Sequence, residues 1–276
     1  VVPQEPGIRR PKELPLSLRL NKELHAKLMT GVRGDQARPG EFRDIQNWIG
    51  RPGVGIGGAT YVPPPPEHLM ACLDAWEKFL HDRSLPPLVQ VALAHYQFEA
   101  IHPFRDGNGR VGRLLITLFL IEREVLPAPL LYLSAFFEAS RADYYDRLQG
   151  VHARGEWDVW LAYFLAGVAS QSKDALSRVT RINTLLTRWR DKAIEGGLPA
   201  AVRLLDLLAA NPFCTVRGVA ERLKVAFTTA QRAVARLEGL GIVKQVNEAK
   251  RDRVYCATAL LKILEEPANL DTWETR

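Results

Sequence analysis

Apolar residues recur every three or four positions through most of the first two thirds of the chain, a period that predicts amphipathic helices. We expect such helices at residues 14–28, 66–80, 88–101, 110–124, 141–154, 157–170 and 173–193. Because the 110–124 stretch is apolar almost throughout, it is expected in the middle of a bundle. Residues 59–62 form a short strand-like run, and the four prolines at 63–66 predict a rigid stop before the next helix.

The pattern changes after residue 193, where Gly-Gly-Leu-Pro at 196–199 is typical of a linker. Shorter helices are expected next, at 200–210, 216–223 and 228–240, followed by strand-like segments at 244–247 and 254–256 around a basic turn. A helix-turn-helix followed by a two-stranded wing is the winged-helix layout. The sequence therefore predicts a mostly α-helical chain: a helical-bundle domain with N-terminal flanking helices at 1–193, a linker at 194–199, a winged helix-turn-helix domain at 200–262 and an acidic tail at 263–276.

The winged-helix segment has a moderate basic excess, with eleven Lys or Arg against five Asp or Glu between residues 200 and 262. Its second helix would present polar side chains to a major groove, and its wing would reach DNA phosphates. The candidate DNA contacts are Thr228, Gln231, Arg232, Arg236, Arg251 and Arg253. Such modules also mediate dimerisation or protein contact, so the sequence leaves DNA binding and a homodimer both open.

Composition changes this picture little. The 276 residues are 47% apolar and 25% charged, as in a soluble globular protein, and no run approaches the roughly 20 apolar residues of a membrane span. Three scattered cysteines indicate neither a disulfide framework nor a zinc site. With a polar, proline-rich start in place of a secretory signal, we expect a cytoplasmic protein that does not contact a membrane. The net charge of +6 suits a nucleotide, nucleic acid or acidic partner.

The most informative segment is the loop between the two buried helices, residues 102–113, with the sequence His-Pro-Phe-Arg-Asp-Gly-Asn-Gly-Arg-Val-Gly-Arg. Its Gly-Asn-Gly turn readily takes positive φ, so successive N–H groups can point into one concavity beside an unpaired helix N-terminus. Arg110 and Arg113 then lie at the positive end of that helix, which is unfavourable unless an anion binds there. Together these groups predict a polyphosphate site.

Two further side chains extend this chemistry. Asp106 would repel phosphate unless a divalent cation lay between them, and Mg²⁺ is commonly held by one or two carboxylates plus phosphate oxygens. His102 is the side chain best suited to accept a proton near neutral pH. The pattern therefore indicates phosphate-group transfer to a nucleophile that His102 deprotonates. His95 has no third ligand at a suitable spacing, so we expect it in the core or supporting the site.

The segment resembles the Fic family signature, His-x-Phe-x-(Asp/Glu)-Gly-Asn-Gly-Arg-x-x-Arg, at every specified position. Flanking runs at 61–64, 131–134 and 144–145 are also similar to Fic proteins that carry a C-terminal winged helix. The resemblance covers about residues 16–171 and, more loosely, the C-terminal module. It implies a Fic helical bundle with a short β-hairpin flap, and a protein adenylyltransferase that moves AMP from ATP to a Ser, Thr or Tyr hydroxyl of a protein target or of itself.

The resemblance also implies roles for the loop. His102 would be the general base, Asp106 would hold Mg²⁺ against the α- and β-phosphates, and Phe104 would anchor the loop in the core. The remaining implied contacts go to the phosphates: the backbone of Gly107, Asn108 and Gly109 to the leaving pyrophosphate, and the side chains of Arg110 and Arg113 to the β- and γ-phosphates. Family members that transfer a terminal phosphate differ at position 108, so the retained asparagine favours AMP.

Two accessory elements follow from the same resemblance. Ala59, Thr60, Tyr61 and Val62 are similar to the flap, whose main-chain edge pairs with the target segment. The side chains of Tyr144, Tyr145 and His152 fall where family members line the adenine pocket.

One familiar element is missing from the sequence. Many Fic proteins carry an inhibitory helix with the pattern (Ser/Thr)-x-x-x-Glu-(Gly/Asn), and neither Glu195-Gly196 nor Glu238-Gly239 fits it. Our hypothesis is that the chain begins inside that region and behaves as a de-repressed enzyme with Arg113 free. Three other functions stay open: transfer of another phosphate-containing group, removal of AMP, and a transcription regulator that only senses nucleotide.

Overall fold

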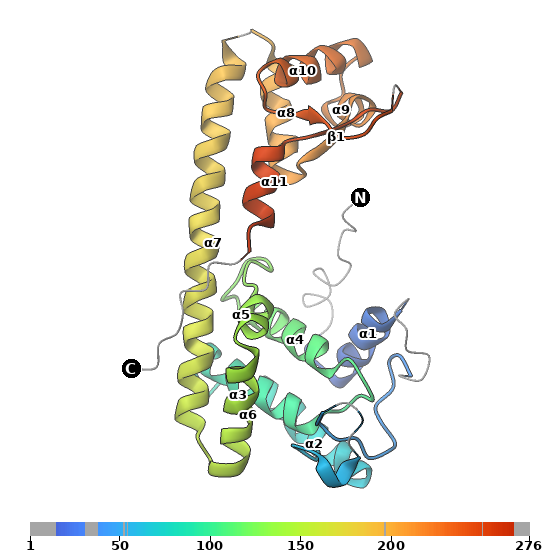
Figure 1. Ribbon diagram of the computed structural model, residues 1–276, viewed down its shortest axis with the longest axis vertical. Helices are drawn as coiled ribbons and strands as arrows, with labels where there is room; N and C mark the ends of the chain where they lie inside the picture. Colours follow the sequence, from blue (N-terminus) through green and yellow to red (C-terminus); the bar gives the residue numbers. More distant parts are fainter. Residues whose placement is uncertain are drawn as a thin grey trace. The chain divides into compact units, whose positions relative to one another are not determined.

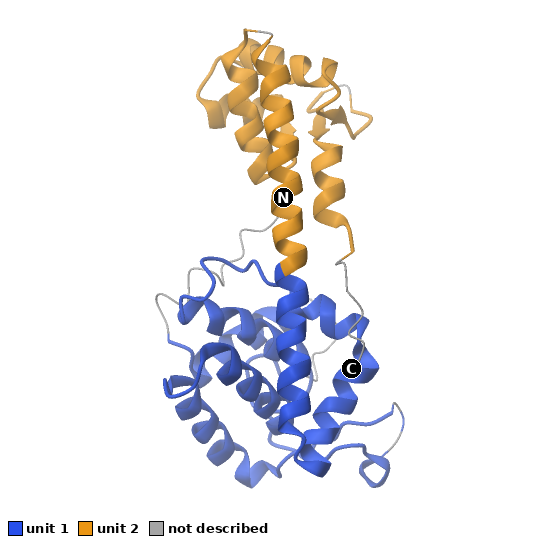
Figure 2. Ribbon diagram, turned by 90° about the vertical axis from the view of Figure 1, so that its left-hand side faces the viewer, with its two compact units in different colours: residues 1–172, 270–276 blue, residues 173–269 orange. Residues whose placement is uncertain are grey.

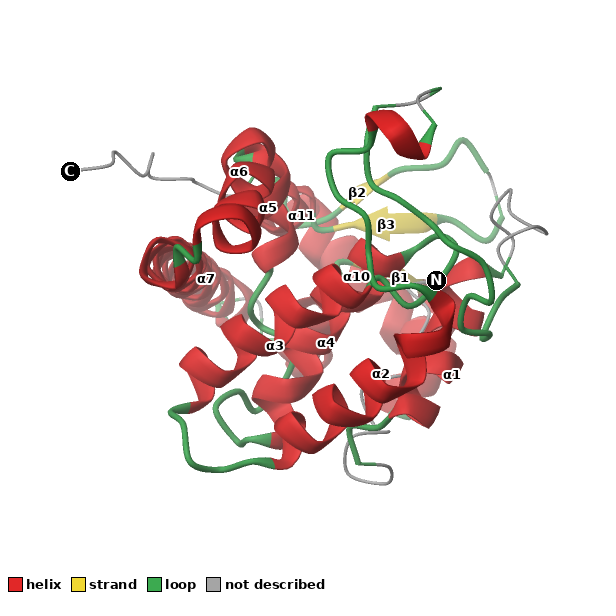
Figure 3. Cartoon of the chain, turned by 90° about the horizontal axis from the view of Figure 1, so that it is seen from below, coloured by secondary structure: helices red, strands yellow, loops and turns green. Residues whose placement is uncertain are grey.

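A computed structural model describes residues 15–30, 38–51, 53, 55–195, 197–249 and 251–267. Within them the fold is mostly helical, as predicted, and the strands belong to one small sheet (Figures 1 and 3). The N-terminal stretch 1–14, the linker glycine at 196 and most of the expected acidic tail, 268–276, lie outside the described residues. None of the described helices is both long and apolar enough to cross a membrane.

The chain divides into two compact units between Ser172 and Lys173 (Figure 2). This division falls inside α7, a continuous helix of 38 residues, Trp157–Ile194. The expectation of separate helices at 157–170 and 173–193 is therefore wrong. The intervening Gln171 and Ser172 include neither proline nor glycine, so nothing in the backbone interrupts the hydrogen-bond ladder there.

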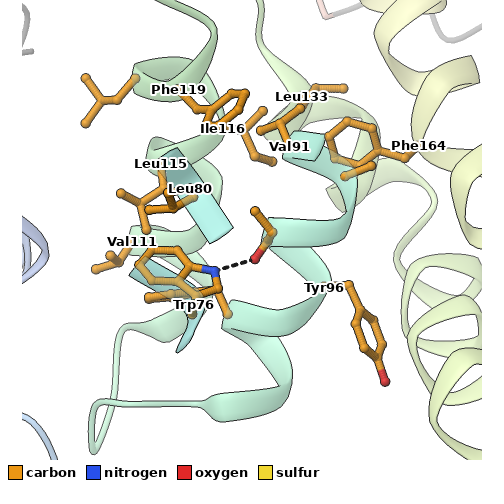
Figure 4. Close-up of a cluster of buried hydrophobic side chains, with 14 of the residues drawn as sticks. Trp76, Leu80, Val91, Tyr96, Val111, Leu115, Ile116, Phe119, Leu133 and Phe164 are labelled. Carbon is orange, nitrogen blue, oxygen red and sulfur yellow. Dashed lines mark hydrogen bonds between the residues drawn. The ribbon is translucent and has the colours of Figure 1, made fainter. Parts of the chain in front are cut away.

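The first unit is built on two adjacent helices, α3 (Pro87–Ile101) and α4 (Asn108–Glu122), which flank the loop at 102–107. Buried residues occur all around α3, and α2 (Pro66–His81) packs beside it. The indole Nε1–H of Trp76 on α2 donates to the carbonyl of Ala94 on α3 at 2.9 Å (Figure 4). This bond satisfies the only polar atom of a fully buried indole, so the packing of α2 on α3 leaves no unpaired donor on that ring.

The remaining helices of this unit complete the bundle: α1 (Leu18–Met29), α5 (Leu133–Ala139) and α6 (Arg141–Arg154). The bounds of α6 match the prediction, whereas α5 was not predicted because its seven residues are too few to show a helical period.

The expected flap is less regular than a β-hairpin. A short 3₁₀ turn, η3 (Ile56–Gly58), precedes it, and one antiparallel bridge joins Ile49 to Tyr61. The Ile49 N–H donates to the Tyr61 carbonyl at 2.9 Å, and the Tyr61 N–H donates back at 3.1 Å. No longer ladder forms among the described residues of this segment.

The second unit has the helices and the wing of a winged helix, as predicted. Helices α8 (Pro199–Ala210), α9 (Val216–Leu223) and α10 (Phe227–Gly239) surround an apolar core. The strands β1 (Phe213–Thr215), β3 (Val254–Cys256) and β2 (Lys244–Gln245) form an antiparallel sheet in that order. Two elements were not predicted, β1 and the terminal helix α11 (Thr258–Glu265).

Gly167 of α7 gives a test of the packing of α5 on α7. A Cβ at this position would lie 2.6 Å from Cδ1 and 2.7 Å from Cε1 of Phe136, which is itself buried. Gly167→Ala should therefore lower the free energy of unfolding by about 1–3 kcal/mol, as overpacking does. Denaturant unfolding measures this change. The matched control is Gly239→Ala in α10, where a Cβ meets nothing within 4 Å, and it should leave stability unchanged or raise it. Equal effects of the two substitutions would contradict the packing argument.

Candidate active site

The loop between α3 and α4 holds its shape through its own residues. His102 ends α3 in the left-handed conformation, with φ 50° and ψ 60°, and Gly107 takes φ 78° just before α4 begins. The side chain of Asn108 closes the loop: its Oδ1 accepts from the Phe104 N–H and its Nδ2 donates to the Phe104 carbonyl, both at 2.8 Å. Phe104 is fully buried, which confirms that it anchors the loop. The asparagine side chain thus shapes the loop from inside.

The start of α4 presents unpaired backbone donors. The Gly107 N–H donates to Oδ1 of Asp106 at 2.6 Å, but the N–H groups of Asn108, Gly109 and Arg110 have no acceptor among the described residues. Unpaired N–H groups and the helix dipole place partial positive charge at this end of the helix. The position is therefore suited to bind an anion.

A buried arginine outside the motif fixes the other end of the loop. Arg43 is 3% exposed, and the acceptors of its guanidinium among the described residues are all backbone carbonyls. Its Nε reaches the His102 carbonyl at 3.0 Å, its Nη1 the Ile45 carbonyl at 3.2 Å, and its Nη2 the Ile101 carbonyl at 3.3 Å as well as that of Pro64. One guanidinium thus joins the end of α3 to the segment that follows the flap. The sequence did not reveal it, because Arg43 lies between acidic residues in a stretch without apolar period.

Two amide side chains near Arg43 also donate to backbone carbonyls of the loop and of the segment after the flap. Asn47 Nδ2 donates to the carbonyls of His102 at 3.2 Å and Phe104 at 3.1 Å, while Gln46 Nε2 donates to the Pro63 carbonyl at 2.9 Å. From the flap, the Tyr61 hydroxyl donates to the Ala100 carbonyl at 3.0 Å. The flap is thereby tied to the last turn of α3.

The imidazole of His102 is arranged to accept a proton. Its Nδ1 lies 3.2 Å from the Glu99 carbonyl, which can only accept, so Nδ1 carries the hydrogen and Nε2 keeps its lone pair. Burial is the main cause that lowers the pKa of His102, to about 4. The ring is therefore neutral near pH 7.

A cavity of about 670 Å³ opens beside His102, within the range of small-ligand pockets. It brings together eight of the predicted site residues: His102, Gly109, Arg113, Thr60, Tyr61, Tyr144, Tyr145 and His152. The rings of Tyr61 and His152 meet edge to face at 4.7 Å, so the flap and α6 touch across this cavity.

The other predicted residues of the first unit do not line the cavity. Ala59 and Val62 flank the bridged part of the flap, and the side chain of Asn108 is engaged with Phe104. Arg110 Nη2 lies 3.1 Å from Met29 Sδ and 3.8 Å from Asp106 Oδ2, whereas Arg113 faces the cavity. The two arginines therefore point to different surroundings, and phosphate contact by Arg110 stays a prediction.

A carboxyl group not predicted from the sequence lies at the base of the cavity. Glu99 is 9% exposed, and its Oε1 has no hydrogen-bond partner among the described residues. Gly112 makes room for it, because a Cβ there would lie 2.7 Å from Oε1. Burial raises the pKa of Glu99 to about 7, although the nearby Arg113 opposes that shift.

His95 lies in the core beside this group, as expected. Its Nε2 is 2.9 Å from the Tyr144 hydroxyl, and the ring stacks on Phe137. Burial lowers the pKa of His95 to about 3 and raises that of Tyr144 well above 10. Both groups are therefore uncharged near neutral pH.

The residues present fit a magnesium ion that is bound together with phosphates. The Asp106 carboxylate is 67% exposed, and its Oδ2 lies 3.8 Å from Arg110 Nη2. No cluster of three or more His, Cys, Asp or Glu side chains forms a cage among the described residues. A single carboxylate next to an anion site is nevertheless the arrangement in which Mg²⁺ takes most of its ligands from phosphate and water.

In the second unit, the candidate DNA contacts lie on α10 and the wing. Thr228, Gln231 and Arg232 are exposed, opposite the buried Ala230, Ala233, Val234 and Leu237, and Arg236 is half-buried on the same helix. Arg251 and Arg253 are exposed in the turn before β3.

Two parts of the chain match known protein families. Residues 15–120 match the Fic/DOC family, and residues 201–244 match the winged helix-turn-helix DNA-binding family. The chain is 39% identical over 113 residues to the Protein adenylyltransferase Fic of Drosophila virilis, covering 40% of this chain and 21% of that protein. It is 31% identical over 159 residues to Protein adenylyltransferase fic-1 of Caenorhabditis elegans, covering 56% and 27%. The chain thus spans about a quarter of the length of these relatives.

A solved structure shows the same fold. A Fic family protein from Desulfovibrio desulfuricans G20 superposes with a TM-score of 0.55 at 18% identity, covering 91% of this chain and 72% of that one. This likeness concerns the fold, while the family matches cover residues 15–120 for Fic/DOC and residues 201–244 for the winged helix-turn-helix.

Glu99 makes the stability of the fold depend on pH. Because its pKa is raised from 4.5 to about 7, the folded state binds this proton more tightly than the unfolded chain. Its contribution is complete below pH 4.5 and is lost as the pH rises through 7. The free energy of unfolding of the parent should therefore fall by up to about 3 kcal/mol between pH 5 and pH 8 through this group. Glu99→Gln, whose side chain stays neutral, should not show this fall.

Denaturant unfolding at these two pH values checks this expectation. Glu138→Gln is the matched control, since that side chain is 70% exposed, and it should change the pH dependence little. An identical pH dependence in the parent and in Glu99→Gln would contradict the assignment.

Proposed function

We propose that this chain, with its Fic/DOC-family domain at residues 15–120, is a protein adenylyltransferase that moves AMP from ATP to a Ser, Thr or Tyr hydroxyl of a protein. The observation that carries the proposal is one cavity in which a neutral His102 faces Arg113 and the N-terminus of α4. A base and an anion site that line the same cavity suit attack on a phosphorus atom. The target is another protein or a second copy of this chain.

In the proposed reaction, Nε2 of His102 takes the hydroxyl proton while the hydroxyl oxygen attacks the α-phosphorus. The bond from that phosphorus to the bridging oxygen breaks, and pyrophosphate leaves with the bonding electrons. The backbone of Gly107, Asn108 and Gly109, together with Arg110 and Arg113, would hold the pyrophosphate end in line with the attacking oxygen. Such positioning supplies most of the catalysis in phosphoryl transfer.

Asp106 would hold Mg²⁺ against the phosphates. When bound, the cation neutralises charge that builds up on the leaving oxygen. The same loop offers the carboxylate and the N–H groups from adjacent residues, which supports this placement.

Around the cavity, Tyr144, Tyr145 and His152 of α6 would receive the adenine. The backbone of Ala59, Thr60, Tyr61 and Val62 would pair with the target segment by strand addition. The bridge at Tyr61 and its ring contact with His152 support a flap that lies next to the nucleotide.

The test uses ATP labelled separately at the α- and γ-phosphates, with Mg²⁺. Protein should acquire α-label and no γ-label. His102→Ala should reduce the transfer at least about a hundredfold, the usual contribution of a general base, while ATP binding persists. The control His95→Asn alters a buried histidine that does not line the cavity, and should keep more activity than His102→Ala. Label from the γ-position alone would identify a phosphotransferase, and ATP binding without any label would favour a different donor or a nucleotide sensor.

A second candidate function belongs to the other unit. We propose that α10 and the wing bind DNA, because the polar and basic residues of this surface face solvent while the apolar residues of α10 form the core. In this arrangement Thr228, Gln231, Arg232 and Arg236 would contact the major groove and Arg251 and Arg253 the phosphates.

Fluorescence anisotropy with a random 30-base-pair duplex tests this candidate. The affinity should fall steeply with salt, and the double variant Arg251→Ala/Arg253→Ala should lower the salt slope by about 2. Lys262→Ala, an exposed cation on α11, is the control and should leave the slope unchanged. Binding that is absent at low salt, together with a dimer in light scattering, would assign the module to self-association.

A further inference from the structure

His25, a buried histidine of α1, contacts the loop at 102–107. His25 is 0% exposed, and its ring stacks on Phe104 with centroids 3.9 Å apart and planes 4° from parallel. The Gly40 N–H donates to Nδ1 of this ring at 2.9 Å, while Nε2 lies 3.0 Å from the Asp106 carbonyl oxygen. His25 occupies an ordinary buried position of an amphipathic helix, so its local sequence carries no signal of a role at the loop.

These two contacts determine where the ring carries its proton. Because an N–H group donates to Nδ1, that nitrogen must be the acceptor. The hydrogen of the neutral ring is therefore on Nε2, which donates to the Asp106 carbonyl. Burial lowers the pKa of His25, with Arg110 opposing and Asp106 favouring the charged form, so the neutral ring persists near pH 7.

The bond reaches a peptide unit on which the anion site depends. The Asp106 carbonyl and the Gly107 N–H belong to one planar peptide group, so fixing the oxygen also fixes the direction of the N–H. That N–H in turn holds the Asp106 carboxylate through Oδ1 at 2.6 Å. His25 therefore acts on one end of the peptide and the Asp106 side chain on the other.

The same helix supports the loop at neighbouring points. A Cβ at Gly107 would lie 3.0 Å from Met29 Sδ and 3.5 Å from Nε2 of His25, so the loop packs tightly against α1 at this point. The guanidinium of Arg110 also rests on Met29 Sδ, at 3.1 Å. Among the described residues of α1, His25 forms a side-chain hydrogen bond to the loop backbone, whereas Met29 contacts the loop through its sulfur.

We propose that His25 is a positioning residue of the phosphate site: its Nε2–H donor orients the Asp106–Gly107 peptide, and with it the carboxylate and the N–H groups that receive the polyphosphate. The proposal rests on the phosphate-binding role of this loop in the proposed function. A ligand would not touch His25, whose effect passes through one hydrogen bond to the backbone.

Two substitutions, His25→Gln and His25→Asn, distinguish this positioning role from a purely structural role in packing. In His25→Gln, the side-chain amide reaches the place of Nε2 and can still donate to the Asp106 carbonyl, but no longer accepts from Gly40. In His25→Asn, the shorter amide can accept from Gly40 but cannot reach Asp106. Each variant loses one hydrogen bond and the stacking on Phe104, so both melting temperatures should fall by similar amounts.

The affinity for phosphate ligands should differ between His25→Gln and His25→Asn. We expect His25→Gln to keep the ATP and inorganic pyrophosphate affinities within about threefold of the parent, and His25→Asn to weaken both at least about tenfold, the effect of losing one hydrogen bond that orients the site. Isothermal titration calorimetry with each ligand measures this directly, and α-label transfer should follow the same order. The control His68→Asn, on the exposed face of α2, should behave as the parent.

The possible outcomes are distinguishable. Equal affinities in the Gln and Asn variants at matched melting temperatures would overturn the positioning role, even if the parent transfers AMP normally. A parent that binds pyrophosphate but transfers no label would overturn the proposed function, while the split between the two variants would still support the role of His25. A parent that binds neither ligand would overturn both.

Discussion

The buried guanidinium of Arg43 is the interaction on which the arrangement of the first unit depends. A charge this far from water is tolerated only when its donors are satisfied, and here backbone carbonyls from three separate stretches of chain supply the acceptors. Burial lowers the pKa of Arg43, yet this group stays protonated at any physiological pH. The end of α3 and the segment after the flap must therefore meet around it, which sets the place of the His102 ring relative to the cavity.

Two independent supports thus act on one short loop. Arg43 and Asn47 hold its beginning through the carbonyls of His102 and Phe104, whereas His25 of α1 holds the Asp106 carbonyl near its end. The left-handed His102 between them needs such support, because that conformation is strained for a residue with a side chain. A site fixed before any ligand arrives does not have to spend binding energy on ordering itself.

The sequence was informative where local pattern decides structure. Helical period placed α2, α3, α6, α8, α9 and α10 within a residue or two, and the loop motif pointed to His102 and Arg113, which line one cavity. The sequence did not predict contacts between residues that are far apart along the chain. Arg43, Asn47, His25 and Glu99 carry no local signal, since what distinguishes them is a carbonyl, a ring or a glycine that the fold brings to them. The sequence also does not predict the continuity of α7. The apolar pattern changes near residues 171–172 and suggests a helix end there, although the helical backbone continues without a break.

The double contact between Asn108 and Phe104 has a consequence for the evolution of specificity. Both polar atoms of this amide are engaged, and the side chain is 2% exposed, so a ligand has no access to it. A carboxylate or an aliphatic side chain could not supply both bonds, so such a substitution would change the shape of the loop as well as remove the two contacts. Under the proposed function, a substitution at position 108 would therefore act on the bound phosphates through the shape of the loop, although the side chain itself does not contact them.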